Sequence, residues 1–198
     1  MELLPATQIA EAIIEKLAPY CKIINIAGSI RRQKTEVKDI ELVVLPKKEV
    51  VAATLDMFSE QVATEQNSKE FGLAVKQLGT IHKGTYTGKY MKIELIQGIM
   101  LDLFIPMGFD YYRQYAIRTG SADYSYKIIA TGWKKKGWVG TDSGLRKIRD
   151  CDKIISAAGK VSYKCVVANP ELPPCWESEA SFFSWLGVDY LPPTERNL

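Results

Sequence analysis

The amino-acid sequence predicts an α+β protein built from two successive parts. In the first half of the chain, short β-branched apolar runs alternate with segments of helical periodicity, which is typical of a β-sheet covered by helices. Near Pro106–Gly108 the composition changes, and a basic stretch of helical periodicity begins. We therefore expect a first domain over residues 1–107 and a smaller α+β domain over residues 108–198.

Each element of the first part has its own local signal. Ile9, Ile13 and Leu17 recur at four-residue spacing after Thr7, so we expect a helix over residues 7–19 that Thr7 caps. Further along, apolar or alternating runs bounded by Gly and Pro predict strands. The remaining predicted segments are strands at 22–27 and 39–45, a helix at 48–62 and a hairpin or meander over 79–105.

The second part is predicted to be mixed as well. Residues 109–136 have helical and basic character, with two glycines as interruptions. Short strands are expected over residues 143–168. A last helix is expected over residues 178–186, where Gly187 ends it.

The composition excludes several classes of protein. With 198 residues, 46% hydrophobic and 25% charged, the chain is neither a disordered segment nor a collagen-like repeat. Four scattered cysteines without a C-x-x-C pair predict free thiols in a reducing compartment, and the single histidine, His82, excludes a His-rich zinc site. No long apolar run or signal-peptide pattern is present, so we expect an intracellular, cytoplasmic protein.

The net charge of +3 conceals an uneven distribution. Residues 113–164 hold 12 Lys and Arg against 4 Asp and Glu, whereas the segments on either side are net acidic. A basic middle in a nearly neutral protein indicates a polyanionic partner on one face. The simpler interpretation of such a charge run is a solvated surface.

Two carboxylates, Asp39 and Glu41, interrupt an apolar predicted strand. Residues two apart on a strand share a face, so these side chains lie next to each other. Because adjacent buried like charges are costly, a hard divalent cation such as Mg²⁺ or Mn²⁺ is the natural counter-charge. Asp102 interrupts a second apolar strand, and if the two strands are neighbours, three carboxylates converge as a two-metal site requires. The alternative is an edge strand with a polar outer face.

Gly28 and Ser29 directly follow the first predicted strand. Glycine permits close approach of the backbone, and the amides and the Ser hydroxyl can cradle phosphate oxygens. Arg31 and Arg32 add positive charge where a triphosphate would need it. A strand, this Gly-Ser-x-Arg-Arg segment, a paired-acid strand and a third acid together form a specific combination.

This combination resembles the signature of the family X DNA polymerases, which belong to the nucleotidyltransferase superfamily. Besides Gly28–Arg32 and Asp39–Glu41, the segment around Asp102 resembles the third-carboxylate strand of that family. Arg118–Ser121 resembles its Thr-Gly-Ser turn, and residues 186–196 resemble its C-terminal close. The motifs cover essentially the whole chain in the family's order, and the short members encoded by phages and other viruses look nearest.

The resemblance implies a nucleotidyltransferase palm with a mixed β-sheet, followed by a basic, thumb-like α+β subdomain that binds nucleotide and DNA. Asp39, Glu41 and Asp102 would be the catalytic residues and would hold two Mg²⁺ ions, for which Mn²⁺ can substitute. The reaction would be attack of a primer 3′-hydroxyl on the α-phosphorus of a nucleoside triphosphate. Positioning and charge neutralisation would carry most of this catalysis.

The family also implies which residues hold the incoming nucleotide. Those on its phosphates would be Gly28, Ser29, Arg31 and Arg32, and those in the turn beside it Thr119, Gly120 and Ser121. In two places the chain departs from the family: Glu41 stands where Asp is usual, and Ile117-Arg118 replaces an aromatic pair. Too few residues precede the first motif strand for the amino-terminal domain of larger members, so we expect no lyase activity.

Lys134, Lys135 and Lys136 lie between Trp133 and Trp138 in the basic middle of the chain. Lysines that neutralise phosphates next to aromatic side chains that stack on bases are typical of a DNA-binding segment. The alternative is that both tryptophans belong to the core and the lysines are only solvated.

The sequence therefore favours a DNA-directed DNA polymerase that fills gaps during repair. We expect a monomer that binds primer-template or gapped DNA and nucleoside triphosphates and does not contact membranes. Two alternatives remain. One is a nucleotidyltransferase with another acceptor, or a template-independent terminal transferase, and the other is a DNA-binding module without catalysis.

Overall fold

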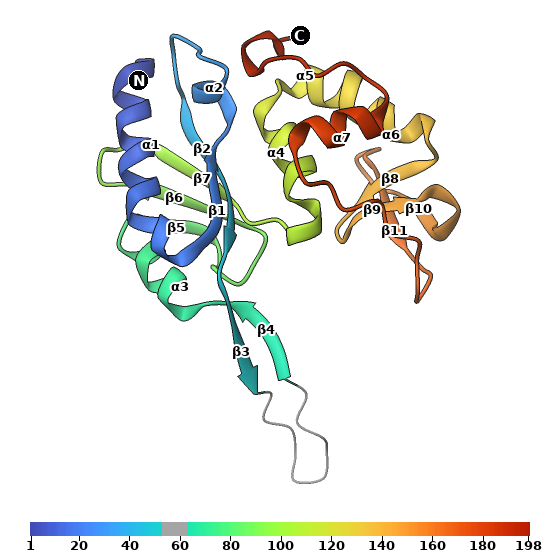
Figure 1. Ribbon diagram of the computed structural model, residues 1–198, viewed down its shortest axis with the longest axis horizontal. Coiled ribbons are helices and arrows are strands. Elements are labelled where there is room, and N and C mark those ends of the chain that lie inside the picture. Colours follow the sequence, from blue (N-terminus) through green and yellow to red (C-terminus); the bar gives the residue numbers. More distant parts are fainter. Residues whose placement is uncertain (53–62) are drawn as a thin grey trace. The chain divides into compact units, whose positions relative to one another are not determined.

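The computed structural model describes residues 1–52 and 63–198 (Figure 1). The chain is a mixed α+β protein, as the sequence predicts. It divides into two compact units, which we call the N-terminal unit (residues 1–111) and the C-terminal unit (residues 112–198).

A five-stranded mixed sheet forms the centre of the N-terminal unit. Its strands, in spatial order, are β1 (Cys21–Ile26), β2 (Asp39–Pro46), β7 (Met100–Phe104), β6 (Tyr90–Leu95) and β5 (Gly79–Gly84). Only β2 and β7 pair in parallel, and the other neighbours are antiparallel. Alternate residues of these strands pack with α1 (Leu3–Leu17) and α3 (Lys69–Lys76) into one apolar core, so one face of the sheet is committed to packing.

The first helix begins earlier than the sequence predicts. It runs from Leu3 to Leu17, so Thr7 lies inside it, and the Thr7 hydroxyl donates a hydrogen bond to the Leu3 carbonyl at 2.8 Å. Thr7 is therefore not the cap. Pro5 falls in the first turn, where the missing amide hydrogen of proline costs no helical bond.

The predicted helix over 48–62 is wrong at its start. Residues Lys48–Ala52 form strand β3, which pairs antiparallel with β4 (Ala63–Asn67). The remaining apolar residues of that prediction, Leu55, Phe58 and Val62, lie outside the described residues. The helix in this region is instead α3, which was not predicted from the sequence. Its N-terminal cap is Ser68, whose hydroxyl oxygen accepts the Phe71 amide.

The C-terminal unit is a set of short helices and two hairpins around an aromatic core. Trp133, Trp138, Trp176, Phe182 and Phe183 are buried together. The helices are α4 (Tyr111–Thr119), α5 (Ala122–Tyr124), a π-helix (Ser125–Ala130), α6 (Thr131–Lys135) and α7 (Glu179–Leu186). The hairpins are β8 (Trp138–Thr141) with β9 (Gly144–Lys147), and β10 (Cys151–Ile155) with β11 (Val161–Cys165).

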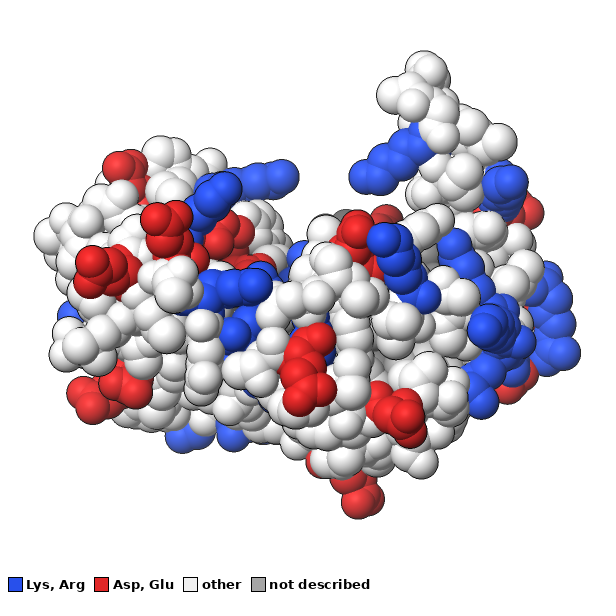
Figure 2. All heavy atoms as spheres, turned by 90° about the horizontal axis from the view of Figure 1, so that it is seen from above, with Lys and Arg blue, Asp and Glu red and all other residues white. Residues whose placement is uncertain are grey.

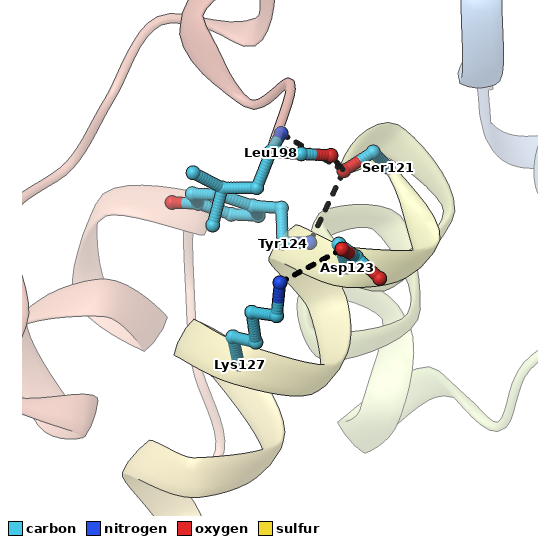
Figure 3. A network of polar contacts seen from close by, with 5 residues as sticks. All are labelled: Ser121, Asp123, Tyr124, Lys127 and Leu198. Atoms are coloured by element: carbon cyan, nitrogen blue, oxygen red, sulfur yellow. Dashed lines mark hydrogen bonds and ion pairs between the residues drawn. The ribbon is translucent and has the colours of Figure 1, made fainter.

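The predicted last helix is confirmed, with Ser178 as its cap and Gly187 in a left-handed conformation after it. The C-terminal residues then return to the start of α5 (Figure 3). The Ser121 hydroxyl accepts the amides of Tyr124 and Leu198 at 3.1 and 3.2 Å, and the Ser121 amide donates to the Arg196 carbonyl at 2.9 Å. One serine thus caps α5 and fixes the end of the chain.

A buried ion pair holds this return in place. The Arg196 side chain is fully buried, and its Nη1 lies 2.6 Å from Oε1 of Glu179, which is also buried. The guanidinium stands 4.7 Å from the ring centre of Phe183 and 5.0 Å from that of Tyr190, and Nε donates to the Leu191 carbonyl at 2.8 Å. A buried pair of this kind is costly to break from one side only.

We predict that Arg196→Met destabilises the protein by about 3–5 kcal/mol, because the Glu179 carboxylate is left buried without its counter-charge. Urea unfolding monitored by tryptophan fluorescence measures the loss. Lys127→Met is the matched control: it breaks an exposed ion pair with Asp123 at 2.8 Å (Figure 3), for which about 0–1 kcal/mol is expected. Equal losses in the two variants would contradict the structural role of Arg196.

Candidate active site

The strand register brings all three predicted acids to one face of the sheet. In the parallel pairing of β2 with β7, Glu41 lies directly opposite Asp102, and Asp39 lies two residues earlier on β2. Their neighbours Ile40 and Leu101 point into the apolar core. Because side chains alternate along a strand, the acids occupy the opposite face. The two acid-bearing strands are therefore neighbours, which is the condition that the sequence analysis set for the three carboxylates to share a face.

Two residues of β6 lie beside Asp102. Lys92 is its direct neighbour in the antiparallel pairing of β6 with β7. The Tyr90 hydroxyl donates a hydrogen bond of 2.6 Å to Oδ1 of Asp102. Neither residue was predicted from the sequence to belong to the site. The alternation of polar and apolar residues along 90–95 was the available signal for their face, but only the strand register shows which acid they meet.

Glu41 is bound closely to the segment that follows β1. The Ala27 amide donates to the Glu41 carbonyl at 2.8 Å, and Gly28 has a φ of +60°. A Cβ atom at Gly28 would overlap the Glu41 carboxylate and stand 3.0 Å from the Glu41 Cβ. Glycine is therefore needed at position 28 for two reasons: the backbone is left-handed there, and the Glu41 side chain leaves no room for a Cβ atom.

Ser29 and Arg31 lie in α2 (Gly28–Arg31), and Arg32 directly follows it. The Ser29 hydroxyl oxygen is buried and has no hydrogen-bond partner among the described residues. Burial lowers the pKa of the Arg32 guanidinium, and the carboxylates of Glu41 and Asp39 act against that shift. Arg32 thus lies within electrostatic reach of two of the three acids. Arg31 is half-buried at the end of the same short helix.

The donor set suits a hard divalent cation, because carboxylate oxygens are the ligands that Mg²⁺ prefers. The side chains themselves are not gathered around one point: within residues 1–52 and 63–198, no three His, Cys, Asp or Glu side chains form a group that could hold a metal ion. Glu41 extends toward Gly28, and Asp102 accepts the Tyr90 hydroxyl. The register thus places three carboxylates on one face of the sheet, and the side-chain conformations do not gather them around one point.

The predicted nucleotide-binding turn of the C-terminal unit has a packing role in the structure. Thr119 is fully buried. A Cβ atom at Gly120 would stand 2.7 Å from the Tyr124 ring, so glycine is needed for this contact. Ser121 caps α5 and binds the backbone of Leu198. A nucleotide contact by these residues stays a prediction.

The predicted DNA-binding lysines are exposed, and the tryptophans beside them are not. Lys134, Lys135 and Lys136 lie at the surface at the end of α6, and Lys and Arg side chains gather along the right-hand edge of Figure 2, over the C-terminal unit. Trp133 and Trp138 are buried in the aromatic core. Of the two interpretations of these tryptophans, the one in which they stack on bases is therefore wrong, and the one in which they are core residues is confirmed.

No family model matches the sequence, and no curated protein is significantly similar to it. Among the helices of the described residues, none has both the length and the apolar character needed to span a bilayer.

We predict that Gly28→Ala destabilises the protein more than Gly98→Ala does. Both glycines have a positive φ, of +60° and +76°, so alanine is strained at either position by about 1 kcal/mol. At Gly98 no atom lies within 4 Å of the added Cβ, whereas at Gly28 the Glu41 side chain must move. Urea unfolding of both variants measures the difference, and a loss no larger at Gly28 would exclude a tight contact with Glu41.

Proposed function

We propose that the chain is a nucleotidyltransferase that acts as a DNA-directed DNA polymerase of the X type and fills gaps during repair. One observation supports this most: the β2–β7 register places Glu41 opposite Asp102 on the face that also carries Asp39. The Gly28–Ser29 segment that would bind phosphate touches the same Glu41. Acids for metal ions and a phosphate-binding segment are thus adjacent, as phosphoryl transfer requires.

The residues of the proposed site divide between metal binding, phosphate binding and the positioning of a ligand. Asp39, Glu41 and Asp102 would hold two Mg²⁺ ions, which when bound would neutralise the charge that develops on the transferred phosphoryl group. The Ser29 hydroxyl, buried and without a partner among the described residues, would donate to a phosphate oxygen. Arg32 would neutralise the phosphates. The Tyr90 hydroxyl would orient the Asp102 carboxylate through their 2.6 Å hydrogen bond.

A DNA-binding module without catalysis is the second candidate. The observation that favours it is the absence, among the described residues, of three acidic, His or Cys side chains grouped around one point. Against it stands the register itself, which keeps three acids on one face beside Gly28. Addition of Mg²⁺ or Mn²⁺ distinguishes the two, because only the enzyme converts nucleoside triphosphates.

Primer extension on a gapped duplex, with the same primer without template beside it, tests the proposal. Extension that depends on template supports the polymerase. Untemplated addition would replace it with a terminal transferase, and binding of DNA without any nucleotide transfer would replace it with the binding module.

We predict that Asp102→Asn reduces primer extension by about 100-fold or more, since one ligand charge of the metal site is removed. The matched control is Asp152→Asn, which neutralises an exposed carboxylate on β10. It should leave the rate within about twofold, since an exposed charge outside the proposed site contributes little. Thermal unfolding of both variants shows whether the fold is retained. Extension by Asp102→Asn within about tenfold of the wild type would remove Asp102 from the site.

We predict that changing Lys134, Lys135 and Lys136 together to Ala weakens DNA binding and flattens its salt dependence. Each lost phosphate contact should lower the slope of log affinity against log salt by about 0.9 on duplex DNA. Fluorescence anisotropy over a salt series measures the slope. The control is the triple change of Lys16, Lys69 and Lys76 to Ala, exposed lysines on α1 and α3 of the N-terminal unit. The same slope in wild type and the first variant would mean that the triplet is only solvated.

A further inference from the structure

The β10–β11 hairpin begins and ends with a cysteine. The two strands pair antiparallel, Cys151 lies directly opposite Cys165, and the pairing continues to Ile155 opposite Val161. Most side chains of the hairpin are exposed, and its two strands form a sheet of their own. An isolated two-stranded hairpin is marginally stable in water, so its ends are the places where a covalent link would matter most.

The hydrogen-bond pattern identifies the kind of pair that the cysteines form. The Val166 amide donates to the Asp150 carbonyl at 3.0 Å, and the Ser156 amide donates to the Lys160 carbonyl at 3.0 Å. Hydrogen-bonded and non-hydrogen-bonded pairs alternate along an antiparallel ladder, so both bonds give the same pattern, in which Cys151 and Cys165 form a non-hydrogen-bonded pair. In such pairs the Cα atoms stand about 4.5 Å apart and the side chains are closest, which is within the range that a disulfide spans.

The two thiols are neighbours that act on each other electrostatically. Burial raises the pKa of the Cys151 thiol, and the neighbouring Cys165 thiol raises that pKa further. The Cys165 thiol also lies 3.7 Å from the Val167 carbonyl, to which it donates. Both cysteines are partly exposed, so a small disulfide reagent can reach them.

The other two cysteines lack this arrangement. Cys21 is buried in the N-terminal unit, where burial raises the pKa of its thiol to about 12. Cys175 is exposed and lies outside the described strands. Of the four free cysteines, only Cys151 and Cys165 are cross-strand partners.

We propose that Cys151 and Cys165 are a site of reversible disulfide formation that locks the β10–β11 hairpin. The oxidant is a low-molecular-weight disulfide such as oxidised glutathione. One cysteine thiolate attacks the glutathione disulfide and releases one glutathione thiolate, which leaves a mixed disulfide on the protein. The second cysteine thiolate then attacks the protein sulfur of that mixed disulfide and releases the second glutathione. The two protein thiols lose two electrons and two protons, and one glutathione disulfide becomes two thiols.

The disulfide would constrain a hairpin that carries positive charge. Lys153, Lys160 and Lys164 lie on or within the hairpin and are exposed. Closing the loop between residues 151 and 165 removes open conformations of the hairpin, so oxidation holds these lysines on a fixed scaffold. This inference does not depend on the proposed polymerase activity.

Treatment of the full chain with oxidised glutathione, followed by intact-mass spectrometry and peptide mapping, tests the proposal. We expect the wild type to yield one linked peptide pair that contains Cys151 and Cys165. Cys175→Ser, which lacks the exposed third thiol, should yield the same linked pair and lose about 2 Da. In each of the single variants Cys165→Ser and Cys151→Ala, the remaining hairpin thiol should instead retain glutathione. A linked pair that contains Cys175, a stable glutathione adduct on Cys151 or Cys165 of the wild type, or a covalent dimer through either of them would overturn the proposal.

Hydrogen exchange provides a second measurement that does not depend on the mass change. Amides of residues 152–164 should exchange at least about tenfold more slowly in the oxidised wild type than in the reduced protein. In Cys165→Ser the oxidant should leave these rates unchanged. Equal rates in the oxidised and reduced wild type would show that the disulfide does not lock the hairpin.

Discussion

The parallel pairing of β2 with β7 is the constraint on which the candidate site depends. It is the one parallel contact in the described central sheet, and it joins segments about 60 residues apart in the chain. A slip of one residue would turn Asp102 into the core and bring Leu101 or Leu103 onto the polar face. Since both leucines are fully buried, the apolar pattern of β7 fixes where its single acid lies. The packing of the core thus determines the face of the sheet on which Asp102 lies.

Glu41 connects this register to the segment that would bind phosphate. Its backbone carbonyl accepts the Ala27 amide, and its carboxylate lies against Gly28. An aspartate, one methylene shorter, would reach less far toward the glycine. The extra methylene brings the Glu41 carboxylate against Gly28, and the charge of Glu41, like that of Asp39, acts on Arg32. Glu41 and the Gly28–Ser29 segment therefore depend on each other's conformation.

The parts of the fold that could be predicted were those with a strong local pattern. The strands at 22–27 and 39–45 and the helix before Gly187 agree with β1, β2 and α7, because alternation, burial and capping act over a few residues. The helix at 48–62 was wrong at its start, since Val50 and Val51 fit a β-strand as well as a helix and the partner strand β4 decided. For the same reason the three acids were identified from the sequence while Tyr90 and Lys92 were not. Their position beside Asp102 is a property of strand register.

The basic segment of the C-terminal unit shows how one stretch of sequence can serve both the core and the surface. Trp133 and Trp138 point into the aromatic core, and the three lysines between them are exposed. The ammonium groups of Lys134 and Lys136 still stand 5.5 and 5.9 Å from the ring centres of Tyr126 and Trp185. Cation–π contacts of this kind hold long side chains near the surface without neutralising them. Trp133 and Trp138, which a DNA-binding interpretation would assign to stacking, belong to the core, and other rings, those of Tyr126 and Trp185, contact the lysines. Any binding of a polyanion here would therefore depend on charge in fixed positions.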